Sequence, residues 1–154
     1  MIDSTKCDIN GKYSISFTTT GQGLEYRLAF FSPPNYYSLQ DAVIIIVGKD
    51  NTVNFSAFKV HLLKARVVIS NNPNPPLNVY TTISSGGKIS GKAGDSTIFL
   101  KVLPNIANFV YFAIQNIDTP TKSNLRIDTV LLSGFADTFR HTFQVNPQLF
   151  KCRL

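Results

Sequence analysis

Apolar and polar residues alternate along much of the chain, and this pattern predicts β-strands. In residues 138–145 the alternation is complete: Phe139, His141, Phe143 and Val145 fall in one phase and polar residues fall in the other. Successive side chains of a strand point to opposite faces, so the apolar phase is expected to build the core. His141 lies in that phase, and we expect it to be a core histidine with a satisfied ring nitrogen.

Two pairs of alternating segments predict β-hairpins. Residues 12–19 and 24–31 are separated by a glycine turn, and residues 124–145 contain two alternating segments joined by a short turn. Neighbouring strands joined by such short connections usually pair with each other. We therefore expect a hairpin near the start of the chain and a second one near its end.

Two segments are apolar in both phases. They are residues 42–47 (AVIIIV) and residues 109–115 (FVYFAIQ). A strand of this composition is typical of a sheet that is covered on both faces. We expect residues 42–47 to form a central strand covered on both faces. For residues 109–115, we expect a sheet that is covered either by its own chain or by another subunit.

Residues 53–70 carry two conflicting patterns. Apolar residues recur there at alternating intervals of three and four, which favours a helix: Phe55, Phe58, Leu62, Ala65 and Ile69. Residues 66–70 are β-branched and favour a strand. The segment is therefore interpreted either as two strands or as a short helix around 54–65 that leads into a strand.

The whole chain, 1–154, is predicted to form one domain, an antiparallel β-sandwich or jelly roll. Turn signals at short intervals indicate about eight or nine strands with at most one short helix. A length of 154 residues suits a single domain of this kind. No repeat of fixed period indicates a solenoid or a propeller.

The charge of the chain does not alter the predicted fold, but it suggests binding partners. Charged residues make up 16% of the chain, against a usual share of about 25%, which favours a surface partly covered by another subunit. The net charge of +6 favours anionic partners such as nucleic acid or an anionic surface. The basic residues are scattered along the sequence, however, so we do not expect nucleic-acid binding to be the main function.

Targeting signals and cysteines say little about location. The first residues are polar where a signal peptide would be apolar, and no apolar run approaches the ~18 residues of a membrane helix. We expect a virion or cytoplasmic protein, secreted only if a leader has been removed. Cys7 and Cys152 lie near the two ends of the sequence, and both a disulfide and free thiols stay open.

One segment imitates a phosphate-binding loop. Residues 86–93 (GGKISGKA) match the pattern G-x-x-x-x-G-K-[ST] except at Ala93, where the Mg²⁺-binding hydroxyl is missing. Such loops lead into a helix whose N-terminus binds the anion, whereas a strand-like segment follows here. We interpret 86–93 as a connection between strands.

The chain is poorly supplied with catalytic groups, and we expect no enzyme activity, metal or cofactor. Glu25 is the single glutamate, and neither His61 nor His141 has a nucleophile or an acid in a recognisable arrangement. Asp128 and Asp137 could face each other across the last predicted turn. The simpler interpretation is that they are surface charges.

Candidate binding residues lie in three predicted loops, 32–40, 71–76 and 85–95, and near them. Adjacent tyrosines in a proline-rich loop are typical of interfaces, because tyrosine has an apolar body and a polar tip. Asparagine and lysine side chains add polar and cationic contacts. The candidate contacts are Tyr36, Tyr37, Asn72, Asn74, Tyr80, Lys88 and Lys92.

One short stretch resembles a known family. Residues 126–130 (RIDTV) resemble a strand near the end of jelly-roll carbohydrate-binding modules of the galactose-binding-like class, with a departure at Thr129. The resemblance covers about ten residues and implies a glycan-binding sandwich. Such modules commonly stack sugars on tryptophan, which this chain lacks, so tyrosines would replace it.

Two functions follow as expectations. The first is a non-enzymatic structural protein, a jelly-roll building block of a virion (capsid, decoration or spike) that acts through contacts with copies of itself or with other virion subunits. The alternative is a carbohydrate-binding, lectin-like module. The all-β pattern, the low charge and the segments apolar in both phases favour the first.

Overall fold

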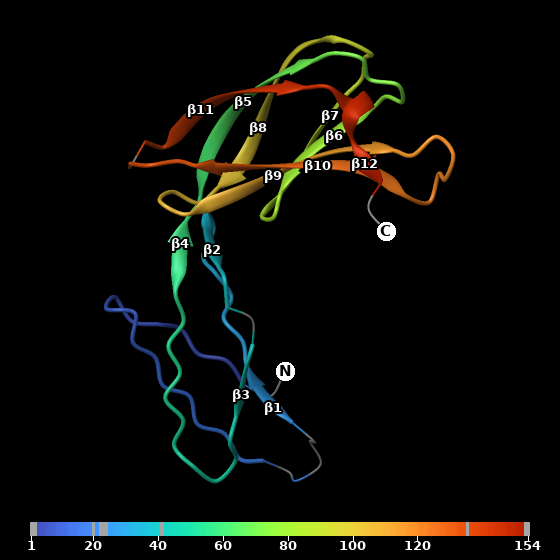
Figure 1. Cartoon of the computed structure of the whole chain (residues 1–154). Coiled ribbons are helices and arrows are strands. Elements are labelled where there is room, and N and C mark those ends of the chain that lie inside the picture. Colours follow the sequence, from blue (N-terminus) through green and yellow to red (C-terminus); the bar gives the residue numbers. More distant parts are fainter. Residues whose placement is uncertain (1–2, 20, 22–24, 41, 135, 153–154) are drawn as a thin grey trace. The chain divides into compact units, whose positions relative to one another are not determined.

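The computed structural model describes residues 3–19, 21, 25–40, 42–134 and 136–152, with the side chain of Cys152 excepted (Figure 1). The chain divides into two compact units. Unit 1 comprises Met1–Phe31 and Ser38–Ser56, and unit 2 comprises Ser32–Tyr37 and Ala57–Leu154. A compact unit is not by itself an independently folding domain, so the single domain stays a prediction.

Regular structure in the described residues is almost entirely β, and no α-helix occurs among them. A single 3₁₀ turn spans Pro147–Leu149. The strands are β1 (Tyr26–Leu28), β2 (Tyr36–Ser38), β3 (Val43–Ile45), β4 (Ala57–Lys59), β5 (His61–Ile69), β6 (Leu77–Thr81), β7 (Ser84–Ile89), β8 (Gly94–Val102), β9 (Ala107–Gln115), β10 (Ser123–Leu131), β11 (Thr138–Val145) and β12 (Lys151–Cys152).

Unit 2 is a β-sandwich, which confirms the predicted all-β fold class, although the described residues of the chain form twelve strands where about eight or nine were predicted. Its large sheet has five strands in the order β12-β10-β9-β6-β7, and its small sheet has three in the order β11-β5-β8. Figure 1 shows the two sheets facing each other. Between them lies a core built from inward-facing residues of both sheets, including Leu63, Val67, Val79, Leu100 and Phe112, all with no exposed surface.

The second predicted hairpin is wrong. β10 pairs with β9 in the large sheet, whereas β11 pairs with β5 in the small sheet, and this pair is parallel while the other pairs of the sandwich are antiparallel. By crossing to the other sheet, β11 places its apolar phase against the core. The rings of Phe143 and Phe112 meet there edge to face, with centroids 5.1 Å apart.

The helix considered around residues 54–65 is also wrong, because the segment forms β4 and β5. In β5 the side chains of His61, Leu63 and Ala65 are buried, and Leu62 between them is 42% exposed. The period of two therefore dominates over the apparent helical stripe. An extended strand buries more of this sequence, since its inward phase is continuous to Ile69.

The structure buries His61 and exposes His141. His141 is exposed, contrary to the prediction, because β11 is an edge strand and the core closes over Phe143 and Val145 instead. The His141 ring lies on the surface beside that of Phe143, with centroids 4.5 Å apart. His61 is the buried histidine, and its Nδ1 donates a hydrogen bond to the carbonyl oxygen of Ala136 at 2.6 Å.

Unit 1 contains a two-stranded antiparallel sheet of β1 and β3. The first predicted hairpin is wrong, since β1 pairs with β3 and no strand forms in residues 12–19. The alternation of half-buried and exposed side chains in 12–19 nevertheless follows the sequence. Aromatic contacts join the half-buried phases: the rings of Phe17 and Tyr26 lie 5.7 Å apart, and those of Phe30 and Phe55 lie 5.5 Å apart.

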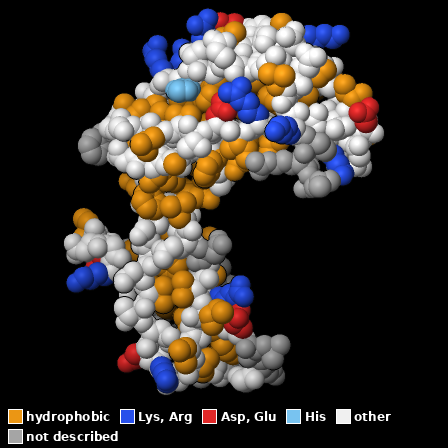
Figure 2. All heavy atoms as spheres, in the orientation of Figure 1, with side chains coloured by type: hydrophobic (Ala, Val, Ile, Leu, Met, Phe, Trp, Pro, Cys, Tyr) orange, Lys and Arg blue, Asp and Glu red, His pale blue; other side chains and the backbone are white. Residues whose placement is uncertain are grey.

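None of the described side chains of unit 1 is buried. The expectation of a central strand at 42–47, covered on both faces, is therefore wrong for the isolated chain. Ile44 is 57% exposed, Ile46 59% and Val47 51%. Figure 2 shows hydrophobic side chains open on the surface of this unit.

Two further predictions concern the whole chain. Cys7 is exposed, and the side chain of Cys152 lies outside the described residues, so both the disulfide and the free thiols stay predictions. Within the described ranges, no helix has the length and apolar character needed to cross a membrane.

Candidate functional site

A tyrosine pair stands on the outer face of the large sheet. Tyr80 of β6 and Tyr111 of β9 are direct partners in the antiparallel ladder. Their neighbours Val79 and Phe112 point inward to the core, so the alternation of each strand places the tyrosines on the opposite face. The two rings are nearly parallel, with centroids 5.0 Å apart and an interplanar angle of 7°.

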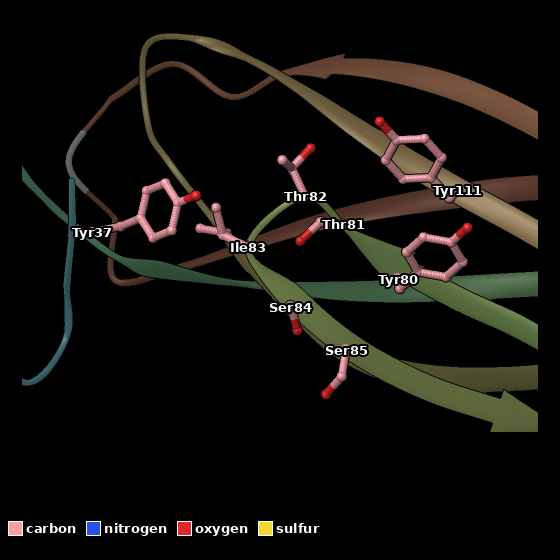
Figure 3. A pocket seen from close by; sticks show the side chains of 8 residues that line it. All are labelled: Tyr37, Tyr80, Thr81, Thr82, Ile83, Ser84, Ser85 and Tyr111. Carbon is pink, nitrogen blue, oxygen red and sulfur yellow. The ribbon is translucent and has the colours of Figure 1, made fainter. Parts of the chain in front are cut away.

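An open hollow of about 610 Å³ lies beside this pair (Figure 3). We call it the tyrosine hollow. It belongs entirely to unit 2, and the turn between β6 and β7 supplies most of its wall. Its lining residues are Tyr37, Tyr80, Thr81, Thr82, Ile83, Ser84, Ser85 and Tyr111.

A β-bulge shapes the wall of the hollow. The pairing of β6 with β7 runs from Val79 opposite Gly87 to Thr81 opposite Ser84, so Tyr80 has no direct partner on β7. Gly86 lies in the bulged part of β7 and has a φ of +61°. A Cβ at this position would lie 1.7 Å from the carbonyl oxygen of Val79. Only glycine fits at this position, and it lets β7 approach the backbone that carries Tyr80.

The lining residues offer ring faces and hydroxyl groups. Aromatic rings with hydroxyls around them suit a neutral ligand with an apolar face and polar edges. No carboxylate, histidine or lysine belongs to the lining residues. Across the described residues, no cluster of at least three His, Cys, Asp or Glu side chains is arranged to hold a metal.

The structure brings together two of the predicted contact residues. Tyr37 and Tyr80 both line the hollow, although 43 positions separate them in sequence. Tyr111 was missed as a contact. Its segment was recognised as apolar in both phases, but only the cross-strand register shows that Tyr111 lies opposite Tyr80. Tyr36 is 45% exposed on β2 and is not a lining residue.

The predicted asparagine contacts lie elsewhere in unit 2 and hold loops. Asn72 is buried, and its side-chain amide donates a hydrogen bond to the carbonyl oxygen of Gly91 at 3.1 Å. Its backbone N–H donates a second hydrogen bond to the carbonyl oxygen of Lys92 at 2.8 Å. Asn74 donates to the carbonyl oxygen of Gln115 at 2.9 Å. Ligand contacts by these residues and by the exposed Lys88 stay predictions.

The two aspartates near the last predicted turn do not face each other. Asp128 accepts hydrogen bonds from the Arg126 guanidinium at 2.7 Å, and Asp137 accepts one from Lys59 at 3.0 Å. The Lys59 hydrogen bond and charge hold the pKa of Asp137 below its ordinary value. Asp137 is an exposed, ion-paired carboxylate, in agreement with its interpretation as a surface charge. Asp128 is half-buried beside Arg126, so its interpretation as a surface charge is wrong.

Residues 86–93 do not form a phosphate-binding loop, as the sequence predicts. Residues 86–89 belong to β7, and the segment after Ala93 is β8 rather than a helix. The local structure therefore has no helix N-terminus to bind an anion.

Comparisons of the chain with protein-family models, curated proteins and solved structures found no match.

Proposed function

We propose that this chain is a non-enzymatic structural protein that assembles through contacts between copies of itself, with unit 1 as the assembly element. The observation that carries the proposal is the absence of any buried side chain among the described residues of unit 1. In its most specific form the proposal makes the protein a building block of a virion, as a capsid, decoration or spike subunit.

Physical chemistry supports a covering partner for unit 1. An isolated two-stranded sheet is marginally stable in water, and among the described residues β1 and β3 pair only with each other. Within the described part of unit 1, each strand therefore keeps an edge without a strand partner, which is a template for pairing with another chain. The exposed Ile44, Ile46 and Val47 form a run of apolar side chains beside that edge.

A second copy of the chain is the partner that we favour. Most soluble oligomers are symmetric assemblies of identical chains. In such an assembly, the same apolar residues of each copy cover one another, and no further protein is required. The low charged fraction of 16% agrees with a chain whose surface is partly buried between subunits.

The test places a charge in the exposed apolar run. Ile44→Asp and Ile46→Asp should dissociate the assembly, because each carboxylate would have to be desolvated in the interface. Sedimentation velocity should show the wild type as an oligomer and each variant as a chain of 17.1 kDa. Leu149→Asp, at a residue of unit 2 that is 74% exposed, is the matched control and should stay oligomeric.

Two outcomes would overturn the proposal. One is a wild type that sediments as a monomer at high concentration. The other is an oligomer whose mass the unit 1 variants leave unchanged.

The tyrosine hollow favours a second candidate, a glycan-binding sandwich. Tyr80 and Tyr111 offer ring faces for the apolar side of a sugar, and Thr82, Ser84 and Ser85 offer hydroxyls for its edge. In a glycan screen, this candidate predicts selective binding that Tyr111→Ala abolishes and that Phe109→Ala, at an outward position of the same strand, preserves. Uniform background across the screen would reject it.

A further inference from the structure

The outer face of the small sheet gathers basic residues that are scattered in the sequence. Its side chains are fixed by register: each outward residue of β5 lies between one of β8 and one of β11. The charged members are Lys64, Arg66, Asp95, Lys101 and Arg140. We call this surface the basic face. Figure 2 shows lysine and arginine side chains along the edge of unit 2 where, in Figure 1, these strands lie.

The charges of the basic face do not balance. Asp95 is the one carboxylate among its residues, and it is already paired with Arg66, whose Nε lies 2.8 Å from Oδ2. This pairing raises the pKa of Arg66 and lowers the pKa of Asp95. Four cations and one anion leave a net charge of +3 on the face, and Lys64, Lys101 and Arg140 carry it.

Two placements on this face are unfavourable for the chain alone. Arg140 lies directly opposite Lys64 on the neighbouring strand, and like charges in that position repel. On the other side of Lys64 lies Phe99, which is 56% exposed to solvent. Lys101 follows Phe99 on the same face of β8, so the exposed ring is flanked by cations.

We propose that the basic face binds single-stranded nucleic acid. The phosphates pair with Lys64, Lys101 and Arg140, and a base stacks on Phe99. One ligand then relieves both unfavourable placements, because it neutralises the repelling cations and covers the exposed ring. A positive surface with an aromatic platform is the general arrangement by which proteins bind single strands without sequence preference.

The aromatic ring decides among anionic ligands. A duplex keeps its bases stacked inside, so it has no free base for Phe99. A sulfated glycan would pair with the cations of the basic face but has no aromatic base to stack on Phe99. Every nucleic-acid base, in contrast, has a π-face that stacks on an aromatic ring. The face lies wholly in unit 2, so the inference is independent of the assembly proposed for unit 1.

Fluorescence anisotropy with a labelled oligothymidylate tests the proposal on the full chain. With three phosphate contacts, the logarithm of the binding constant should fall against the logarithm of salt concentration with a slope of about −2. The double variant Lys64→Gln/Lys101→Gln should reduce the slope to about −0.7. The control Lys122→Gln/Lys151→Gln removes the same charge from exposed positions outside the basic face and should leave the slope unchanged.

Phe99→Ala separates stacking from charge. It should weaken oligothymidylate binding by about tenfold or more while keeping the salt slope, because the ring contributes no charge. A heparin fragment of matched charge should bind more weakly than the oligonucleotide and should not respond to this variant. Three results would each overturn the proposal: no binding at low salt, an equal loss in the control pair, or equal binding of heparin that Phe99→Ala does not affect.

Discussion

Phe109 and Phe112 lie on opposite faces of β9 and respond to different environments. Phe112 has no exposed surface and packs against Phe143, whereas Phe109 is 46% exposed on the outer face of the large sheet. Phe112→Ala removes a core ring and should lower the free energy of unfolding by about 3–5 kcal/mol. Phe109→Ala should cost less than about 1 kcal/mol. Urea unfolding followed by tyrosine fluorescence compares the two, and equal losses would contradict the assigned faces.

The Arg66–Asp95 pair makes a prediction about pH. Its hydrogen bond with Arg66 lowers the pKa of Asp95 from the ordinary value of 3.8. A carboxyl group with a lowered pKa in the folded state stabilises the protein above its unfolded pKa, and this contribution is lost as the pH falls through the folded pKa. The loss should therefore occur below about pH 4, and it should be small because both side chains are solvent-exposed.

Carboxyl chemical shifts in an NMR titration measure this pKa directly. Arg66→Gln should return the pKa of Asp95 to its ordinary value. Lys59→Gln, which removes the partner of Asp137, should raise the pKa of Asp137 and leave that of Asp95 unchanged. An Asp95 pKa that ignores Arg66→Gln would refute the pair in solution.

At the residue scale, the sequence predicts the phase of a side chain better than its depth. Phe143 and Val145 are buried as their alternation predicts, but His141 in the same phase is exposed on the edge strand β11, although Phe139 beyond it packs against the core. Depth depends on the facing sheet, which local alternation does not describe. Tyr111 was missed as a lining residue for the same reason, since its partner Tyr80 comes from a distant segment.

At the element scale, Gly86 fixes the joint between β6 and β7. Its φ is +61°, and a Cβ at this position would lie only 1.7 Å from the Val79 carbonyl oxygen, so there is no room for a side chain. Gly86→Ala should lower the free energy of unfolding by more than ~2 kcal/mol, from backbone strain and the displaced strand. It should also disturb the tyrosine hollow, because Tyr80 of β6 lies opposite the bulge in β7.

Gly91→Ala is the matched control for that substitution. A Cβ at Gly91 would meet only the Ala93 carbonyl oxygen, at 3.4 Å, so stability should change little. Thermal unfolding of both variants compares them. A stable Gly86→Ala protein would show that the bulge is not needed by the fold.

The strands could be predicted from local pattern, whereas their partners could not. β5 and β11 each alternate cleanly, yet nothing local shows that they pair in parallel. The hydrogen bond between His61 and Ala136 joins the starts of these two strands across 75 positions of sequence. The helical stripe in 53–70 misleads because a spacing of three and four also places some residues in the inward phase of a strand. Here Ala65 and Ile69 satisfy both patterns, and burial in the sandwich decides for the strand.

At the scale of the whole molecule, the two units differ in how they bury apolar surface. Unit 2 has a continuous core between two sheets, which confirms the predicted sandwich. The sequence of unit 1 has the same alternation, but none of its described side chains is buried. The prediction that 42–47 is covered on both faces is wrong within one chain. Under the proposed assembly, the covering is supplied by neighbouring copies.

The molar mass of the wild-type protein in solution decides whether unit 1 is an assembly element. Light scattering across a dilution series should give a mass that is a whole-number multiple of 17.1 kDa at high concentration. Obligate assembly couples folding to association, so dilution should reduce the mass and the β-structure of unit 1 together. A mass of 17.1 kDa at every concentration would contradict the proposed assembly.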